Sequence, residues 1–154
     1  MAYIGDGNNM THSLMYACAK VGMNFASASP KGYEPNAQVV ANAKLDAAQS
    51  GSTIEILNDP FAAAKDADIL YTDVWASMGQ EAEHDERVKI FKDYQINNEL
   101  LSVADKRAIV MHCLPAHRGE EIAEDVLEKN ANVIFDEAEN RLHTQKAIMA
   151  LLMG

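Results

Sequence analysis

Short apolar runs alternate with helical patterns along most of the chain. Five runs have the length and flanking turns of strands: Met1–Gly5, Asn24–Ser29, Thr53–Leu57, Ala67–Thr72 and Ala108–His112. The segments after them carry helical spacing or helix-favouring residues: Thr11–Val21, Ala37–Ser50, Phe61–Lys65, Glu83–Lys92, Asn97–Leu101 and Asp125–Glu128. Towards the end of the chain, the pattern predicts a short extended piece at Val133–Phe135 and a long final helix at Glu137–Leu152.

Residues typical of helix ends and helix faces support several of these elements. Leu14, Cys18 and Val21 are spaced by four and three residues, which predicts an apolar face on the first helix. Gly22 follows that helix, as glycine often does just past a helix end. Asp59-Pro60 combines an N-cap residue with proline at the first helical position, so a helix is expected to begin there.

The alternation of strands and helices predicts an α/β fold. We expect a Rossmann-like three-layer sandwich, in which about five parallel strands are covered by helices on both faces. Since no repeat or linker interrupts the pattern, residues 1–154 are interpreted as one domain. In such sheets ligands bind beyond the carboxyl ends of the strands, near the point where the strand order reverses. The corresponding loops are Asp6–Thr11, Ser29–Pro35, Asn58–Pro60, Asp73–Gly79 and His112–Gly119.

Composition excludes several classes of protein. The chain has 13 basic and 23 acidic residues and a net charge of −10, which argues against nucleic acid as a partner. No stretch approaches the roughly 20 apolar residues that cross a bilayer, so we expect no membrane partner. The first residues show no secretion signal, which favours a cytoplasmic location. Two cysteines are too few for a disulfide framework.

The loop after the first strand begins like a dinucleotide-binding motif. Gly5-Asp6-Gly7 starts the pattern G-x-G-x-x-G, but Met10 stands at the third glycine position, and Ala26–Ser29 offers no acidic residue after the second strand. We therefore expect no nicotinamide, flavin or other cofactor. The glycines would still let the backbone approach a ligand. The carboxamides of Asn8 and Asn9 either bind an amino acid or cap the following helix.

The loop after the fourth strand carries a carboxylate. Asp73 follows a strand of buried type and precedes Trp75 and the turn Ser77-Met78-Gly79. A carboxylate there can bind a substrate ammonium group or accept its proton, and the turn adds polar groups suited to a zwitterion. The alternative is structural: Asp73 bonds a local backbone amide and Trp75 fills the core.

The loop after the fifth strand carries a cysteine beside a histidine. Cys113 is interpreted as a nucleophile, a metal ligand or a polar substrate contact. Cys113 together with His112 and His117 could suggest a zinc site. The spacing and the number of these ligands do not match a structural zinc site, so no metal is expected. Cys18 fits the simpler interpretation of a small buried apolar group, because it lies on the apolar face of the first helix.

Four segments together resemble the ornithine carbamoyltransferase family. They have the order and spacing of that family, and they are Gly5-Asp6-Gly7-Asn8-Asn9, Asp73-Val74-Trp75-Ala76-Ser77-Met78-Gly79, His112-Cys113-Leu114-Pro115 and Glu139-Asn140-Arg141. The resemblance covers essentially the whole chain. It identifies residues 1–154 as the ornithine-binding domain, and it implies transfer of a carbamoyl group from carbamoyl phosphate to the δ-amine of L-ornithine, giving L-citrulline and phosphate.

The resemblance also implies where the amino acid binds. Asn9, Asp73, Ser77 and Met78 match the positions that hold the amino-acid end of ornithine, Met78 through its backbone. Asp73 and Cys113 match the groups that manage the protons of the attacking amine. Physical reasoning agrees, because a thiolate and a carboxylate would stabilise the incoming ammonium group and then help to remove its proton.

Other positions are implied for carbamoyl phosphate. Cys113 and Leu114 match positions that contact it, and Arg141 matches the arginine that steadies it. The alternative for Arg141 is a surface ion pair with Glu137 or Glu139 on the same helix. The Leu114–Pro115 bond resembles the cis peptide of the family.

Members of the family have a further N-terminal domain, whose serine-threonine-arginine-threonine loop cradles the phosphate. That sequence does not occur here, so the 154-residue chain alone is expected to form no appreciable citrulline. The resemblance implies that the parent enzyme is a homotrimer or a multiple of one. Two other interpretations stay open: a relative that acts on another amine such as putrescine, and a non-catalytic module that binds ornithine.

Overall fold

Five parallel strands form one sheet in the order β3-β2-β1-β4-β5. The computed structural model describes residues 1–76, 79 and 81–153. The strands are β1 (Ala2–Ile4), β2 (Phe25–Ala28), β3 (Ile54–Leu57), β4 (Ile69–Thr72) and β5 (Ile109–His112). The helices are α1 (Asn9–Val21), α2 (Ala37–Ser50), α3 (Pro60–Ala64), α4 (His84–Phe91), α5 (Asn98–Leu101), α6 (Glu124–Lys129) and α7 (Ala131–Met153), and two 3-10 turns are η1 (Glu81–Glu83) and η2 (Lys92–Tyr94).

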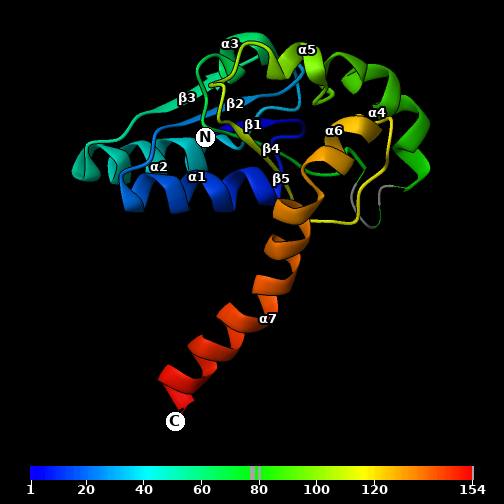
Figure 1. Cartoon of the computed structure of the whole chain (residues 1–154). Helices are drawn as coiled ribbons and strands as arrows, with labels where there is room; N and C mark the ends of the chain where they lie inside the picture. The colour runs from blue at the N-terminus through cyan, green and yellow to red at the C-terminus, as the bar shows by residue number, and fades with distance from the viewer. Residues whose placement is uncertain (77–78, 80, 154) are drawn as a thin grey trace.

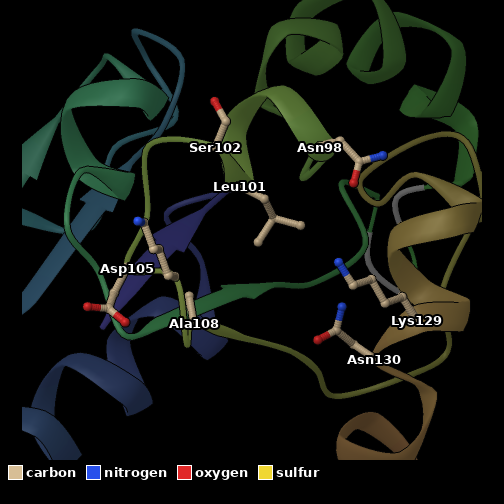
Figure 2. Close-up of a pocket in the computed structure, with 8 residues that line it drawn as sticks. Asn98, Leu101, Ser102, Asp105, Ala108, Lys129 and Asn130 are labelled. Atoms are coloured by element: carbon tan, nitrogen blue, oxygen red, sulfur yellow. The ribbon is translucent and has the colours of Figure 1, made fainter.

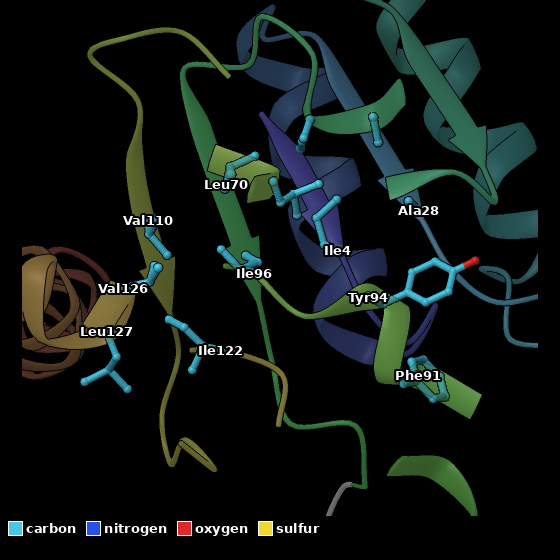
Figure 3. Packing of buried hydrophobic residues seen from close by; sticks show 14 of the residues in the cluster. Ile4, Ala28, Leu70, Phe91, Tyr94, Ile96, Val110, Ile122, Val126 and Leu127 are labelled. Carbon is cyan, nitrogen blue, oxygen red and sulfur yellow. The ribbon is translucent and has the colours of Figure 1, made fainter. Parts of the chain in front are cut away.

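Helices cover both faces of this sheet, so the predicted three-layer α/β sandwich is confirmed (Figure 1). On one face, Tyr3 and Tyr71 of the strands pack with buried residues of α1 and α2. On the other face, Ile4, Leu70 and Val110 pack with the remaining helices (Figure 3). Successive residues of a strand point to opposite faces, which is why β1 sends Tyr3 to one layer and Ile4 to the other.

The residues predicted to cap helices do so in the structure at two helix ends. Asp59 accepts hydrogen bonds from the amides of Phe61 and Ala62, and proline occupies the first helical position of α3. Gly22 has φ +78° and its amide bonds the Cys18 carbonyl, as expected for a glycine just past a helix. Asn8, rather than Asn9, is the N-cap of α1.

Two predictions about helices were wrong. Val133–Phe135 is not an extended piece but part of α7, because Asn130 ends α6 and Ile134 continues the helix with a fully buried side chain. Val133 and Ile134 are β-branched and therefore favour a strand, but the packing of Ile134 in the core outweighs that weak preference. Val21 is 73% exposed, so the buried face of α1 consists of Thr11, Met15, Cys18 and Ala19 instead.

The second half of α7 leaves the sandwich and projects into solvent (Figure 1). Every residue from 141 to 153 is exposed, including the large apolar side chains Leu142, Ile148, Met149, Leu151, Leu152 and Met153. None of the described helices combines the length and the apolarity that crossing a bilayer would need.

Gly7 lies where two loops touch. Its amide donates to the Tyr33 carbonyl at 2.8 Å, and a Cβ at this position would lie 2.3 Å from the Pro35 nitrogen. The expectation that this glycine gives a ligand access to the backbone is therefore wrong, since the space is filled by the Tyr33–Pro35 backbone. Glycine is required here so that the loops after β1 and β2 can pack together.

We predict that Gly7→Ala lowers the free energy of unfolding by about 3 kcal/mol or more, because backbone on both loops has to move. Gly51→Ala is the matched control. Gly51 has φ +81° but open space around it, so alanine there should cost only about 1–2 kcal/mol. Urea unfolding of both variants measures the difference, and equal losses would show that the close approach is unimportant.

Candidate active site

The strand order reverses between β1 and β4. From β1 the chain proceeds to β2 and β3 on one side, and it then returns to β4 and β5 on the other. The loops that follow β1 and β4 therefore flank the switch point, where sheets of this kind bind ligands. Thr72 pairs with His112 in the parallel register, so Asp73 and Cys113, one residue further along, are neighbours.

Asp73 and Cys113 form the centre of this edge. A carboxylate oxygen of Asp73, the thiol of Cys113 and a ring nitrogen of His112 all lie within 4.8 Å of one another. Asp73 is only 8% exposed, and one of its oxygens accepts a hydrogen bond from the Val74 amide at 2.8 Å. The local amide contact suggested as a structural alternative is thus present, and the Asp73 side chain also forms a hydrogen bond with the Cys113 thiol. A carboxylate has further acceptor positions that a ligand can use.

Burial raises the pKa of Cys113 strongly, and the negative charge of Asp73 raises it further. The thiol is therefore protonated at neutral pH. This differs from the expectation of a thiolate, because a second negative charge beside Asp73 is disfavoured in a half-buried position. Cys113 is a neutral group here, able to donate a hydrogen bond.

A tyrosine and a glutamate that the sequence patterns did not single out complete this region. The Tyr71 hydroxyl donates to Glu137 of α7, and its ring stacks on Tyr3 with centroids 6.1 Å apart. Burial raises the pKa of Tyr71, and the hydrogen bond to Glu137 adds to that effect. Tyr71 also neighbours the Cys113 thiol, so the first turns of α7 are fastened to the edge that carries Cys113.

A buried histidine shapes the loop after β5. Nδ1 of His112 accepts the Leu114 amide at 2.9 Å, so its other nitrogen, Nε2, carries the proton and donates to Glu121 at 3.0 Å. Glu121 is fully buried and also accepts the His117 amide at 2.7 Å. These bonds hold Leu114 at φ +54°, a conformation that costs about 1–2 kcal/mol for a side chain of this kind. The predicted cis bond between Leu114 and Pro115 is confirmed.

The loop after β1 is held by a buried ion pair. Arg87 donates to Asp6 at 2.8 Å, to the Trp75 carbonyl at 2.9 Å and to Glu83 at 3.1 Å. Its guanidinium also lies over the ring of Tyr33, 5.1 Å from the centroid. Burial raises the pKa of Asp6 although Arg87 opposes that shift. Asp6 is thus occupied by the protein and is not available to a ligand.

The structure brings together only part of the predicted site. Asp73, Cys113 and Leu114 share one edge, and Asn9 is exposed at the first residue of α1. Arg141 is exposed and is the first residue of the fully exposed run 141–153 of α7. Its proposed ion-pair partners are otherwise engaged, Glu137 with Tyr71 and Glu139 with His143. The predicted residues Ser77 and Met78 lie outside the described residues.

The trio of Asp73, His112 and Cys113 is close enough to suggest a metal site. Both ring nitrogens of His112 are already used, one by the Leu114 amide and the other by Glu121. A metal ion would have to break one of these buried bonds. The arrangement therefore fits a loop-shaping histidine better than a metal ligand.

A cavity of about 240 Å³ lies elsewhere, at the amino end of β5 (Figure 2). Its lining includes Leu101, Asp105, Ala108 and Asn130, and none of the predicted site residues. The Asn130 side chain accepts the Val110 amide at 3.2 Å, so this part of the lining serves the sheet. The cavity is at the wrong end of the strands for the proposed site.

The fold is a parallel α/β domain whose switch point carries the candidate site. The family described as aspartate/ornithine carbamoyltransferase, Asp/Orn binding domain, matches residues 1–152. The ornithine carbamoyltransferase of Thermococcus kodakarensis is 58% identical over the whole chain, which covers 49% of that relative. The chain belongs to this carbamoyltransferase family and corresponds to its Asp/Orn-binding domain.

Solved structures agree with this assignment. The chain matches ornithine carbamoyltransferase from Gloeobacter violaceus with a TM-score of 0.90 and 54% identity, over 99% of this chain and 50% of that one. It matches the enzyme from Pyrococcus furiosus with a TM-score of 0.93 and 55% identity, over 99% and 49% of the two chains. The chain thus spans about half the length of the relatives that it matches.

We predict that Asp73→Asn makes Cys113 more reactive. Removing the carboxylate charge lowers the pKa of the thiol, and each unit of that fall raises the thiolate fraction about tenfold. The pH dependence of alkylation by iodoacetamide, followed by mass spectrometry in a Cys18→Ser background, should shift to lower pH.

Asp68→Asn is the control, because Asp68 is exposed and precedes β4 at its opposite end. It should leave the alkylation profile unchanged. An unchanged profile in Asp73→Asn would contradict the proposed coupling of the two groups.

Proposed function

We propose that this chain forms the ornithine side of an ornithine carbamoyltransferase active site. The observation that carries the proposal is the pair of Asp73 and Cys113 at the switch point, a buried carboxylate beside a protonated thiol. An anionic group there attracts an ammonium ion, and relatives of more than 50% identity are named ornithine carbamoyltransferase.

Asp73 is proposed to hold a charged nitrogen of L-ornithine through its carboxylate. Asn9, Ser77 and the backbone of Met78 are proposed to contact the amino-acid end. Before the δ-nitrogen can attack the carbamoyl carbon, it must lose a proton, because only the neutral amine has a free electron pair. Asp73 and Cys113 are the groups proposed to assist that loss.

Carbamoyl phosphate is the proposed second substrate. The thiol of Cys113 and the backbone at Leu114 are proposed to contact its carbamoyl part, and Arg141 its oxygens. Among the described residues of this edge, the one buried cation, Arg87, is already paired with Asp6 and Glu83. Phosphate binding is therefore proposed to depend mainly on residues beyond this chain, and the complete enzyme is proposed to be a homotrimer or a multiple of one.

We expect calorimetry to detect L-ornithine and norvaline, which share the amino-acid end, but not putrescine, which lacks it. Asp73→Asn should weaken ornithine binding by about tenfold or more, the effect of losing roughly 1.4 kcal/mol from a charged hydrogen bond. Asp68→Asn, at the other end of the same strand, should bind normally. Putrescine binding as tight as that of ornithine would overturn the proposed substrate.

We also expect no appreciable citrulline from ornithine and carbamoyl phosphate with the purified 154-residue chain, since orientation and charge stabilisation of the phosphate supply most of the rate. A colorimetric citrulline assay tests this. Turnover that appears when the other half of a matching relative is added would indicate an enzyme domain, whereas ornithine binding with no turnover even then would indicate a non-catalytic ornithine-binding module. Robust turnover by the chain alone would contradict the expectation.

A further inference from the structure

Two histidines and a glutamate meet on the surface: His84 at the start of α4, and His117 and Glu120 further along the segment that carries Cys113. Nε2 of His84 lies 3.0 Å from Oε2 of Glu120, and Nδ1 of His117 lies 3.5 Å from the same oxygen. The imidazole rings of His84 and His117 pack edge to face, with their centroids 5.9 Å apart. One ligand atom from each of the three residues lies within 4.8 Å of the other two.

The protein holds two of these side chains in place with a tight turn. The Glu120 amide donates to the His117 carbonyl at 3.0 Å, and Gly119 supplies φ +87° between them. Gln95 fixes the turn from outside, donating to the carbonyls of Gly119 and Glu120 at 2.8 Å each. His84, the first residue of α4, approaches from a different segment.

These distances agree with the requirements of a tetrahedral metal ion. Ligand atoms about 2.0–2.2 Å from such an ion lie about 3.3–3.6 Å from one another. The separation of 3.5 Å between His117 and Glu120 lies in that range, the 3.0 Å between His84 and Glu120 is about 0.3 Å shorter, and the third separation is within 4.8 Å. We propose that His84, His117 and Glu120 bind a divalent transition-metal ion, with zinc as the best match.

The donor set determines the class of metal. Two imidazoles and one carboxylate suit zinc, cobalt or nickel, whereas magnesium and calcium prefer oxygen ligands. The side chains of His84, His117 and Glu120 are 35%, 47% and 27% exposed, so an ion can enter and water can complete its coordination. Hydrogen bonds to Asp85 and Glu120 raise the pKa of His84, so an ion must displace a proton there.

This site differs from the trio at Asp73. Both nitrogens of His112 serve buried bonds, whereas His84 and His117 contact mainly the carboxylates that would accompany a cation. A bound ion would join the start of α4 to the loop that carries Cys113 and Leu114. The inference does not depend on which substrate the chain binds.

The test uses the full chain with Cys18 and Cys113 both replaced by serine, so that thiols cannot compete for the ion. Calorimetric titration with zinc chloride at about pH 8 should show one ion per chain. His84→Ala and His117→Ala should each weaken binding by about tenfold or more, because even second-shell changes at metal sites cost that much. Glu120→Gln should also weaken it.

His143→Ala is the matched control. His143 is exposed and lies 3.1 Å from Glu139, so it has the same pairing without a third ligand. It should leave the zinc affinity unchanged. Zinc binding that survives both His84→Ala and His117→Ala, or that is absent from the cysteine-free chain, would overturn the proposal.

A second measurement covers the case in which the cysteine-free chain does not fold. Cobalt added to the unaltered chain should give tetrahedral absorption bands without sulfur-to-metal charge transfer, and His84→Ala should abolish them. Strong sulfur charge transfer together with bands unaffected by His84→Ala would assign the ion to a cysteine and contradict the site. Far-ultraviolet circular dichroism confirms the folding of each variant.

Discussion

The arrangement of the site depends on one buried cation. Arg87 of α4 bonds Asp6 after β1, the Trp75 carbonyl after β4 and Glu83 before the helix, and it stacks on Tyr33 from the loop after β2. A single guanidinium thus fixes three of the loops that surround the switch point. Its planar fork of donors suits this role better than an ammonium group would. Removing any one partner would leave a poorly compensated charge in a position that is 7% exposed.

Arg87 also determines which carboxylate of the site is available to a ligand. It largely neutralises Asp6, so the carboxylate that remains beside Cys113 is Asp73. Two acidic side chains follow neighbouring strands: Asp6 is engaged in the buried ion pair, and Asp73 is the one proposed to contact substrate. The local pattern of residues gives both aspartates the same position, at the carboxyl end of a strand. Only the packing of α4 over the first loop distinguishes them.

The sequence therefore predicts the site residues at the strand ends better than it predicts the residues that hold the surrounding loops in place. Strand-helix alternation placed Asp73 and Cys113 on one edge, since parallel strands deliver their following residues to the same side. The sequence does not predict Arg87 or Glu121 as part of the site, and it suggests Glu137 only as an ion-pair partner of Arg141, because each lies in a helical or loop segment whose charges resemble a solvated surface. Arg87 contacts Asp6 across 81 positions and Glu137 contacts Tyr71 across 66, separations that no local pattern records. The sequence also does not predict that the pKa of Cys113 is raised, because that direction depends on how deeply the thiol is buried.

The raised pKa of Cys113 affects how an amine could react at this site. Burial, the charge and hydrogen bond of Asp73 and the charge of Glu137 all keep the proton on Cys113. A substrate ammonium group beside Asp73 would offset the charge of that carboxylate and so reduce its share of the pKa rise. The pKa of Cys113 would then be lower with the ammonium group bound than without it. A lower pKa makes more of the thiolate available, and only the thiolate can accept a proton from the amine, so the protonation of the substrate and that of the site are coupled.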